Sequence, residues 1–511
     1  MNEYWNNLLN FCINHKKNYI YGCGDYGAII FDYLEQEGVS VDAFLETEPK
    51  RAVRRGIPVF KSTSKDVLYD NNTGIVLAMR NDFRDEVIDY LNEFIDVDIF
   101  YLSDDQYEHL RNRTGNKFDF YYKASNYLSQ YPADRELHMN MWNRILIVQL
   151  DFLGDIIWST PFIRELRRNF PNADIEIIVT KNNGKVLENC PYLNSVHVID
   201  APTSDICRDF YQFEEKCNNM KKYYTNEFGN KKFDVCFLTR NLSMNDKIES
   251  IFLSLHSGAR QRIGWGFVNN LNVRFYEPEF LNVLSDFFTR YVGELRIRHY
   301  VECRLDMLRI CGLKVEDTYQ ELWPMNYEYY SRQFLAEHSI KQNDLILVVG
   351  INGSRPAKNW DIKKYVKAMV GLNERIESKI FFIIAGDKEA LDRAIEVEGV
   401  PGCINMVGKT SINDLINIVK LSSGYLGADT GIGHIAATFG KPTIVLSPHI
   451  SGESGFCQEL VAPRGGRVEF IHPSQGLGGC IGACRVNHSH CINQIEPEDV
   501  ISSVIRLLEE K

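Results

Sequence analysis

The sequence predicts an α/β protein made of several parallel sheets, and three observations support this prediction. Short runs rich in β-branched and aromatic residues alternate with helical patterns, which is typical of parallel strands joined by helices. The alternation occurs in three separate stretches of the chain. The 511 residues are also too many for one core, since a prior of roughly 150 residues per domain predicts about three domains.

The first stretch runs from about Asn18 to Leu102. It opens with the expected strand NYIYGCG, and further strands are expected at VDAFLE, GIVLAM and DIFYL. The polar and aromatic segment YKASNYLSQYPADREL follows, and we interpret it as a helix and a linker. We therefore predict a small Rossmann-like domain with its linker over residues 1–135.

The other two stretches predict a pair of lobes. One opens with the strand RILIVQL, continues with the helix IIWSTPFIRELRRNF, and has later strands at ADIEIIVT and FDVCFLTR. The next opens with DLILVVGING and has strands at KIFFIIAGD, SGYLGAD and KPTIVLS. We predict lobes over residues 142–325 and 326–511. Two Rossmann-like lobes facing a cleft form the architecture called GT-B, and that is the predicted fold.

Composition excludes several classes of protein. The net charge of -11 opposes non-specific binding to nucleic acid or to an anionic membrane. Local basic patches, such as Arg164, Arg167 and Arg168, leave peripheral membrane contact open. No run reaches the ~18 apolar residues of a membrane-spanning helix, and the first residues lack a signal-peptide core, so we expect a cytoplasmic protein. The 13 cysteines are an odd number and do not suggest a secreted disulfide framework.

The segment LDFLGDIIWSTPFIRELRRNFP contains the first candidate catalytic residue. A strand ends, Gly154 permits a tight turn, and Asp155 stands at the start of a helix. A carboxylate there caps free backbone amides in many proteins. It could equally face a cleft and act as a general base toward an acceptor hydroxyl. The segment alone leaves both interpretations open.

Two further segments suit a diphosphate. In GINGSRPAKNW, Gly353 and Ser354 offer donors after a buried strand, and Lys358 adds positive charge within one turn. In GADTGIGHIAATFGKPTIVLS, a strand leads through Asp429 to a helix of small residues whose N-terminus favours phosphate. His434 lies on the first turn of that helix and could donate to an anion. A solvated polar loop and a packed histidine are the alternatives.

Together these segments resemble glycosyltransferase family nine, the ADP-heptose:lipopolysaccharide heptosyltransferases. The resemblance covers about 360 residues in the correct order. It also includes GARQRIGW, RHYVECRLDMLRICGL and VGKTSINDL. It implies a GT-B fold and a nucleotide-sugar-dependent transferase that requires no metal or other cofactor.

The resemblance also implies a role for each matching residue. Asp155 matches the family's proposed catalytic base. The residues that match donor-binding positions are Gly353, Ser354, Lys358, Glu389, Asp429, Thr430, Gly431 and His434. Glu389 matches a carboxylate that grips the donor ribose, although a solvated helix-start glutamate explains it equally. After these positions the chain reads SPHISGESGF in place of the family's GPTDP-like loop.

The C-terminal cysteines are a candidate structural metal site. Cys480, Cys484 and Cys491 are clustered with two histidines, and Cys457 could supply a fourth soft ligand for zinc or iron. The spacings are not those of a common zinc finger. Packed thiols explain the pattern equally well.

The N-terminal domain carries a glycine fingerprint. Gly22, Gly24 and Gly27 follow a strand, and Glu46 comes about 20 residues later, which fits a dinucleotide site. Glycines that only pack a helix on a sheet are the favoured alternative. A docking or regulatory role for this domain stays open.

We therefore expect an inverting glycosyltransferase that moves heptose from ADP-heptose to a hydroxyl of a glycan, a lipopolysaccharide or a protein. A non-catalytic nucleotide-sugar-binding regulator or scaffold is the main alternative. A dinucleotide-dependent oxidoreductase built on the N-terminal glycines is a third hypothesis, but it leaves the two C-terminal lobes unexplained.

Overall fold

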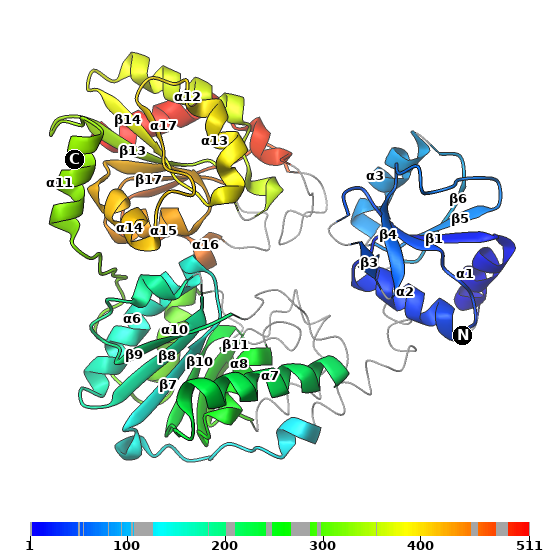
Figure 1. The fold of residues 1–511 in the computed structure, drawn as a ribbon, viewed down its shortest axis with the longest axis horizontal. Coiled ribbons are helices and arrows are strands. Elements are labelled where there is room, and N and C mark those ends of the chain that lie inside the picture. Colours follow the sequence, from blue (N-terminus) through cyan, green and yellow to red (C-terminus); the bar gives the residue numbers. More distant parts are fainter. Residues whose placement is uncertain are drawn as a thin grey trace. The chain divides into compact units, whose positions relative to one another are not determined.

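The computed structural model describes most of the chain. The described residues are 3–49, 52–54, 56–79, 81–93, 95–103, 106, 126–181, 183–200, 210–241, 248–266, 287–293, 298–353, 355–450, 458–476 and 489–509. Contacts divide the chain into two compact units, one with the N-terminal 124 residues and one with nearly all of the rest. Figure 1 shows the elements of both units. None of the described helices has the length and apolar character needed to cross a bilayer.

The N-terminal unit contains one six-stranded sheet with the order β3-β4-β2-β1-β5-β6. All neighbours are parallel except the short pair β3 and β4. Its elements are α1 (Glu3–Asn14), β1 (Lys17–Tyr21), α2 (Asp25–Gln36), β2 (Ala43–Glu46), β3 (Val53–Arg54), β4 (Ile57–Lys61), β5 (Thr73–Leu77), α3 (Asn81–Asn92) and β6 (Asp98–Tyr101).

Alternation along β1 explains why this sheet has helices on both faces. Ile20 packs into one apolar cluster with residues of α1 and α2. Tyr19 and Tyr21 point to the opposite face and pack in a second cluster. Side chains alternate between the faces of a strand, so the three successive buried residues Tyr19, Ile20 and Tyr21 need cover on both sides.

The second unit contains two lobes, each built on a fully parallel six-stranded sheet. The first sheet has the order β12-β11-β10-β7-β8-β9. The elements of this lobe are η1 (Met139–Met141), β7 (Arg144–Gln149), α6 (Leu153–Asn169), β8 (Asp174–Thr180), η2 (Gly184–Leu187), β9 (Ser195–Ile199), α7 (Phe210–Phe228), β10 (Val235–Asn241), α8 (Ile248–His256), β11 (Gln261–Gly266), β12 (Arg290–Gly293) and α10 (Tyr300–Arg309).

The C-terminal lobe repeats the same strand order, β15-β14-β13-β16-β17-β18. Its elements are α11 (Tyr327–Glu337), β13 (Leu345–Gly350), η4 (Pro356–Lys358), α12 (Ile362–Arg375), β14 (Ile380–Ile384), η5 (Lys388–Ala390), α13 (Leu391–Val397), β15 (Cys403–Asn405), α14 (Ile412–Leu421), β16 (Gly424–Ala428), α15 (Gly431–Thr438), β17 (Thr443–Leu446), α16 (Gln458–Val461), β18 (Val468–Ile471), η6 (Cys491–Gln494) and α17 (Pro497–Glu509).

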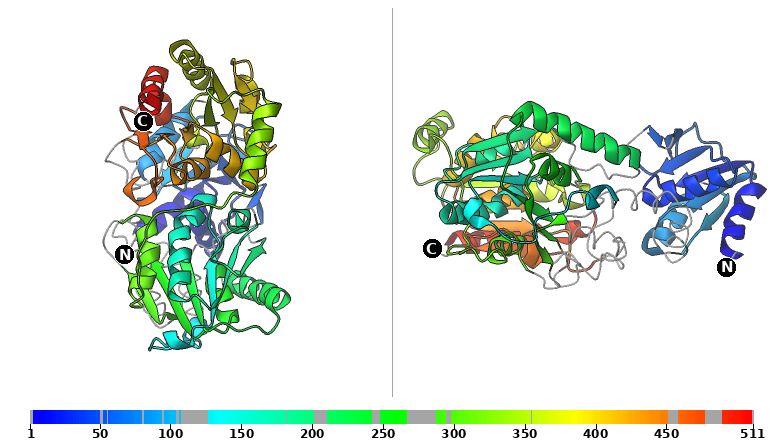
Figure 2. Two further views of the ribbon diagram at one scale, coloured as in Figure 1. Left: turned by 90° about the vertical axis from the view of Figure 1, so that its left-hand side faces the viewer. Right: turned by 90° about the horizontal axis from the view of Figure 1, so that it is seen from below.

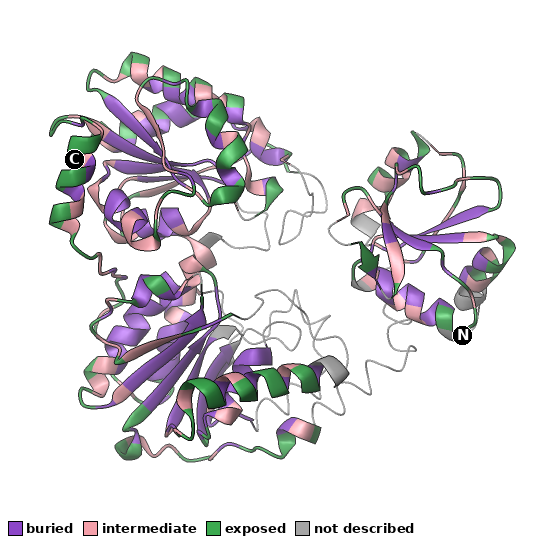
Figure 3. Cartoon of the chain, in the orientation of Figure 1, coloured by how far each residue is buried: buried purple, intermediate pink, exposed green. Residues whose placement is uncertain are grey.

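Both lobes have the doubly wound order in which the first strand is central and the chain reverses direction beside it. The predicted α/β fold is confirmed. The views in Figure 2 show helices on both sides of each sheet, and Figure 3 shows that the central strands are buried while the outer faces of the helices are exposed. The sequence prediction did not name five strands of the two lobes, β9, β11, β12, β15 and β18. Of these, β9, β15 and β18 are only partly buried and carry a weak apolar pattern.

The two lobes of the second unit share one apolar core. The largest cluster of buried residues contains Trp158 and Ile163 from α6 together with Ile432 and Ile435 from α15. Direct packing of α6 against α15 joins the two halves of this cluster. The N-terminal ends of these two helices are therefore placed by a buried apolar interface.

Candidate functional site

Asp155 lies in the first turn of α6, directly after the buried strand β7. It is the third helical residue, and 22% of its side chain is exposed. Its carboxylate Oδ1 accepts a hydrogen bond of 3.4 Å from a guanidinium nitrogen of Arg304. This contact orients the carboxylate, and a general base must be held within hydrogen-bond reach of the proton that it takes.

Arg304 on α10 is a buried cation that the sequence interpretation did not single out. Only 1% of its side chain is exposed, and it lies 3.9 Å from the carboxylate of Asp151 as well as beside Asp155. Three aromatic rings surround the guanidinium at 5.5 to 5.9 Å, and they belong to Trp158, Trp265 and Tyr300. One signal was present in the sequence: Arg304 stands on the same helical face as buried apolar residues, where a charge needs a partner.

A proline inside α6 is accommodated locally. Pro161 has no amide hydrogen, so the carbonyl of Ile157 loses its usual helical donor. The hydroxyl of Thr160 donates to that carbonyl at 2.8 Å and replaces the missing bond. The same hydroxyl accepts from the backbone amide of Glu321 at 3.1 Å. The Thr-Pro pair thus ties the middle of α6 to the segment that leads from the first lobe to the second.

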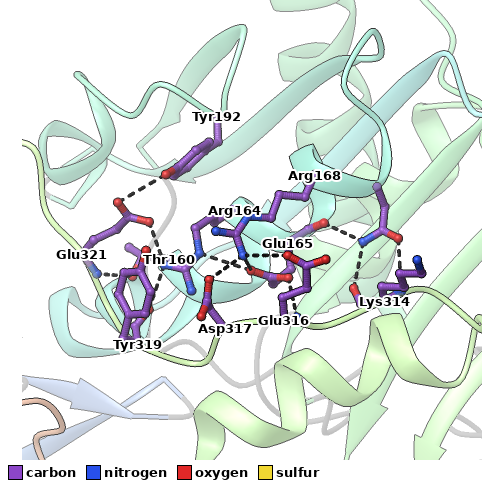
Figure 4. A network of polar contacts seen from close by, with 11 residues as sticks. Thr160, Arg164, Glu165, Arg168, Tyr192, Lys314, Glu316, Asp317, Tyr319 and Glu321 are labelled. Carbon is purple, nitrogen blue, oxygen red and sulfur yellow. Dashed lines mark hydrogen bonds and ion pairs between the residues drawn. The ribbon is translucent and has the colours of Figure 1, made fainter.

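A polar network fixes the rest of α6 to this connecting segment (Figure 4). Arg164 and Glu165 are each 1% exposed and lie 3.2 Å apart. Arg164 also donates to Glu321 at 2.7 Å, and Arg168 pairs with both Glu165 and Asp317. The sequence suggests a local basic patch at Arg164, Arg167 and Arg168, but Arg164 is buried and paired with Glu165 and Glu321. The network holds the helix that carries Asp155.

The loop after β13 brings Lys358 to the end of the sheet. The amide of Gly353 donates to Oδ1 of Asn359 at 2.7 Å, so the loop folds back on itself. A Cβ atom on Gly353 would lie 2.5 Å from Cβ of Lys358, and this close approach requires glycine. The ammonium of Lys358 lies 2.8 Å from Oδ2 of Asp429. Ser354 lies outside the described residues.

Asp429 and Thr430 lead from the buried strand β16 into α15. Thr430 is the residue before the helix, and Gly431 is the first residue within it. The hydroxyl of Tyr425 donates to the carbonyl of Ala428 at 2.7 Å and lies 3.2 Å from Oγ1 of Thr430, which holds the turn. Burial opposes ionisation of Asp429, but the attraction of Lys358 outweighs it and lowers the pKa of that carboxyl.

The N-terminal ends of α6 and α15 meet, and this contact brings the candidate residues of the two lobes together. A Cβ atom on Gly431 would lie 2.6 Å from the side chain of Leu153. A Cβ atom on Gly154 would lie 2.9 Å from Cδ2 of His434. Two helix N-termini therefore face one region with a carboxylate on one side and a lysine and a histidine on the other. Free amides and the dipole at such termini favour an anion.

His434 is buried and neutral. Only 4% of the residue is exposed, and burial lowers the pKa of the imidazole to about 4. The indole Nε1 of Trp158 lies 3.3 Å from Nδ1 of His434, and the two rings are nearly perpendicular at 87°. This contact crosses between the lobes. The sequence interpretation selected His434 but gave no reason to connect it with Trp158.

A second contact between the lobes involves α10. Nε2 of His299 hydrogen-bonds with the carbonyl of Ala462 at 2.8 Å, and burial lowers the pKa of His299 to about 4. Arg464 pairs with Glu302 at 3.2 Å. These contacts hold the C-terminal lobe beside the helix that carries Arg304.

The remaining predicted residues are placed as follows. Glu389 is exposed on the short helix η5, and its backbone amide donates to Asp387. Of the proposed metal ligands, Cys457, Cys480 and Cys484 lie outside the described residues. Cys491 is described and buried, with His490 Nδ1 3.3 Å from its sulfur. Within the described part of the chain, no three His, Cys, Asp or Glu side chains are grouped to hold a metal.

In the N-terminal unit, the glycine fingerprint has a structural explanation at two of its three positions. Gly22 has a φ of +101°, and a Cβ atom on Gly27 would collide with the carbonyl of Gly22. Gly24 has open space around its Cα. Glu46 turns toward the same loop and accepts from the amide of Cys23 at 3.4 Å. The turn and the close packing of α2 therefore account for Gly22 and Gly27.

Comparison with known proteins identifies relatives of the second unit. A family model described as glycosyltransferase family 9 (heptosyltransferase) matches residues 227–447. The chain is 22% identical over 305 residues to lipopolysaccharide heptosyltransferase 3 of Escherichia coli, which covers 57% of this chain and 79% of that protein. It is 21% identical over 382 residues to lipopolysaccharide core heptosyltransferase OpsX of Haemophilus influenzae, and the match covers 71% of this chain and 96% of that protein.

Solved structures show the same fold. A family 9 glycosyltransferase from Veillonella parvula superposes with a TM-score of 0.57 at 18% identity, covering 72% of this chain and 98% of that one. The ADP-heptose heptosyltransferase II of E. coli superposes with a TM-score of 0.50 at 15% identity, and the match covers 71% of this chain and 98% of that one. The two-lobed second unit therefore has the predicted GT-B architecture.

Proposed function

We propose that this chain is a nucleotide-sugar-dependent glycosyltransferase of family 9, as the family model and the heptosyltransferase relatives support, and that it transfers heptose from ADP-heptose with inversion. The names of its relatives support heptose as the sugar, since they are heptosyltransferases that act in lipopolysaccharide assembly. The proposed acceptor is a hydroxyl of lipopolysaccharide, of another glycan or of a protein. The observation that carries the proposal is the meeting of the α6 and α15 N-termini, with Asp155 and Lys358 contributed by different lobes.

In the proposed reaction, the acceptor oxygen forms a bond to the anomeric carbon of heptose. The bond between that carbon and the β-phosphate oxygen breaks, and its electron pair leaves with ADP. Asp155 takes the proton of the acceptor hydroxyl as the new bond forms. Its partial exposure gives an acceptor access to the carboxylate, and Arg304 orients the carboxylate through the hydrogen bond of 3.4 Å.

The other lobe stabilises the negative charge that develops on the departing diphosphate. The amides at the start of α15 and the helix dipole favour phosphate oxygens. Lys358 supplies a positive charge beside this terminus, and His434 supplies a neutral donor. Asp429 orients Lys358 through the 2.8 Å ion pair. Preorganised charges and dipoles of this kind contribute through their stronger interaction with the transition state than with the bound donor.

A panel of nucleotide sugars tests this proposal. Purified full-length protein is heated with ADP-heptose, ADP-glucose, UDP-glucose, GDP-mannose or ADP alone, and the unfolding midpoint is measured. A ligand at 100 times its dissociation constant stabilises a fold by about 2.7 kcal/mol, so the true donor gives the largest shift. Release of ADP with a heptose-deficient lipopolysaccharide acceptor then measures transfer. A larger shift and turnover with another nucleotide sugar would contradict heptose as the donor.

Matched variants separate binding from chemistry. Asp155→Asn should bind ADP-heptose as tightly as the natural protein but turn over slowly. Lys358→Ala should lose both donor stabilisation and turnover. Normal donor binding without any transfer, in the natural protein and with every acceptor class, would instead support the nucleotide-sugar-binding regulator.

A further inference from the structure

Trp158 and His434 form a hydrogen bond whose direction can be assigned. Trp158 lies on α6 and is 5% exposed, and His434 lies on α15 and is 4% exposed. The indole Nε1 is 3.3 Å from the imidazole Nδ1, and the ring centroids are 5.1 Å apart. An indole nitrogen can donate a hydrogen bond but cannot accept one. Nδ1 of His434 must therefore be the acceptor and carries no proton.

The position of the imidazole proton follows from this direction. A neutral imidazole carries one proton, on Nδ1 or on Nε2. His434 is neutral near pH 7 because burial lowers its pKa to about 4. With Nδ1 occupied as an acceptor, the proton lies on Nε2.

Nε2 faces the N-terminal turn of α6. A Cβ atom built on Gly154 would lie 3.2 Å from Nε2 and 2.9 Å from Cδ2. Any side chain at position 154 would therefore crowd the donor edge of the imidazole, and glycine keeps that edge free. Nε2 makes no hydrogen bond to another of the described residues. Its proton is directed to the region where the two helix termini and Lys358 can hold a diphosphate.

We propose that Trp158 is a positioning residue that holds His434 in the Nε2–H tautomer, so that a neutral N–H donates to a phosphate oxygen of the nucleotide sugar. This inference rests on the proposed function for one point only, which is that the ligand at His434 is the phosphate of a nucleotide sugar. A flip of the imidazole would put a carbon in front of the indole N–H and would leave that buried donor without an acceptor. Trp158 thus restricts both the tautomer and the ring orientation. Because Trp158 belongs to the other lobe, His434 is set for the phosphate only when the lobes are in contact.

Nitrogen NMR tests the tautomer directly and does not depend on transfer. The full-length protein is labelled with ¹⁵N-histidine, and the His434 signals are assigned by their loss in His434→Gln. Protonated and unprotonated imidazole nitrogens have different chemical shifts. The natural protein should show protonated Nε2 and unprotonated Nδ1 at pH 7. Trp158→Phe keeps an aromatic ring but removes the donor, so it should give a mixture of tautomers.

Trp142→Phe is the matched control. Trp142 is 3% exposed in the same lobe, and its indole nitrogen donates to Gln261 at 2.9 Å. The control therefore loses a buried indole hydrogen bond without touching His434, and its His434 signals should match the natural protein. ADP titration should show weaker binding to Trp158→Phe, by roughly two- to tenfold for loss of one oriented hydrogen bond. With a competent donor, kcat should fall by a similar factor relative to the control.

Two results would overturn the role of Trp158. One is a proton on Nδ1 of His434 in the natural protein. The other is an unchanged tautomer and unchanged ADP affinity in Trp158→Phe. If ADP-heptose is not a substrate but the tautomer and ADP affinity respond as expected, the heptose assignment fails while the role of Trp158 stands.

Discussion

The ammonium of Lys358 lies 2.8 Å from Oδ2 of Asp429 and 3.1 Å from the backbone carbonyl of the same residue. The two charged residues that the sequence assigned to the donor site therefore bind each other. Lys358 comes from the loop after β13 and Asp429 from the end of β16, and these two strands are neighbours in the sheet. An incoming phosphate would share Lys358 with Asp429, and the ion pair would already hold the lysine ammonium in place.

Lys358→Ala should weaken donor use. The change removes a preorganised positive charge, which typically stabilises a transition state by about 2–4 kcal/mol. We expect kcat/KM for the donor to fall by roughly 30- to 1000-fold. Steady-state kinetics measures the effect, and Lys358→Arg should recover part of it because the charge returns with different geometry. Unchanged kinetics in Lys358→Ala would remove this residue from the site.

Asp155→Asn should separate catalysis from donor binding. The amide keeps the size of the carboxylate, and folding should survive with little loss. It cannot accept the acceptor proton, so kcat should fall by about 10²–10⁴-fold. Donor affinity, measured by calorimetry, should change little, since the phosphate groups are expected at α15. Near-normal kcat would show that Asp155 acts only in the structure of the helix.

Two N-terminal truncations should behave differently. Deletion of residues 1–124 removes the first compact unit and should leave a folded and active lobe pair. Deletion of residues 1–134 also removes Tyr131, whose carbonyl accepts a hydrogen bond from the buried Arg262. Loss of that acceptor should destabilise the longer truncation by about 1–3 kcal/mol relative to the shorter one.

Urea unfolding of both truncations, followed by tryptophan fluorescence, measures this difference. Transfer activity is assayed in parallel with the full chain. An inactive shorter truncation beside an active full chain would show that the first unit is required for catalysis.

His197 should make stability depend on pH. It is held between Glu176 and Glu227 at 2.7 Å from each. Burial opposes protonation, but the two carboxylates outweigh it and raise the pKa of His197 above 6.5. Burial likewise opposes ionisation of Glu176, yet hydrogen bonds from His197 and Lys231 lower its pKa to about 2. The charged histidine is therefore stabilised in the folded state.

Because the pKa of His197 is raised in the folded state, its contribution to folding stability is fully present below the unfolded pKa of 6.5. The contribution is lost as pH rises through the folded pKa. Because the pKa of Glu176 is lowered, its contribution to folding stability is present above pH 4.5 and is lost as pH falls toward 2. The stability difference between the natural protein and His197→Gln should therefore be largest between pH 4.5 and 6.5. It should shrink at higher pH. Urea midpoints from pH 5 to 8.5 measure it, and a constant difference would contradict the assignment.

Glu165→Ala should be far more harmful than Arg168→Ala. Glu165 accepts from the buried Arg164 and from the backbone amide of Glu316. Its removal leaves buried donors with fewer acceptors and should cost about 3 kcal/mol. Arg168 is 37% exposed, and an ion pair of that kind contributes about 1 kcal/mol or less. Equal unfolding midpoints for the two variants would contradict a structural role for the buried network.

Local sequence patterns were sufficient to predict the two-lobed GT-B architecture of the second unit. Apolar runs such as RILIVQL and KIFFIIAGD became the central strands β7 and β14, because a strand covered on both faces must be apolar at nearly every position. Asp155 and Asp429 were found because each lies where a buried strand leads into the next helix. Strand ends are visible in sequence, whereas Arg304 and Glu165 interrupt apolar helical faces, and their roles follow from distant partners, Asp155 for Arg304 and the amide of Glu316 for Glu165.

The sequence by itself indicated three α/β stretches, a resemblance to glycosyltransferase family nine, and the short-range placement of Asp155, Lys358 and His434 after their strands. Those features depend on residues that are close in the sequence, so the periodicity of apolar residues in strands and helices is enough to predict them. Only the tertiary structure decided that Gly154 faces His434 and that Trp158 donates to it, since 276 positions separate the two rings. Which nitrogen of His434 carries a proton depends on this packing of α6 against α15, and no local pattern encodes it.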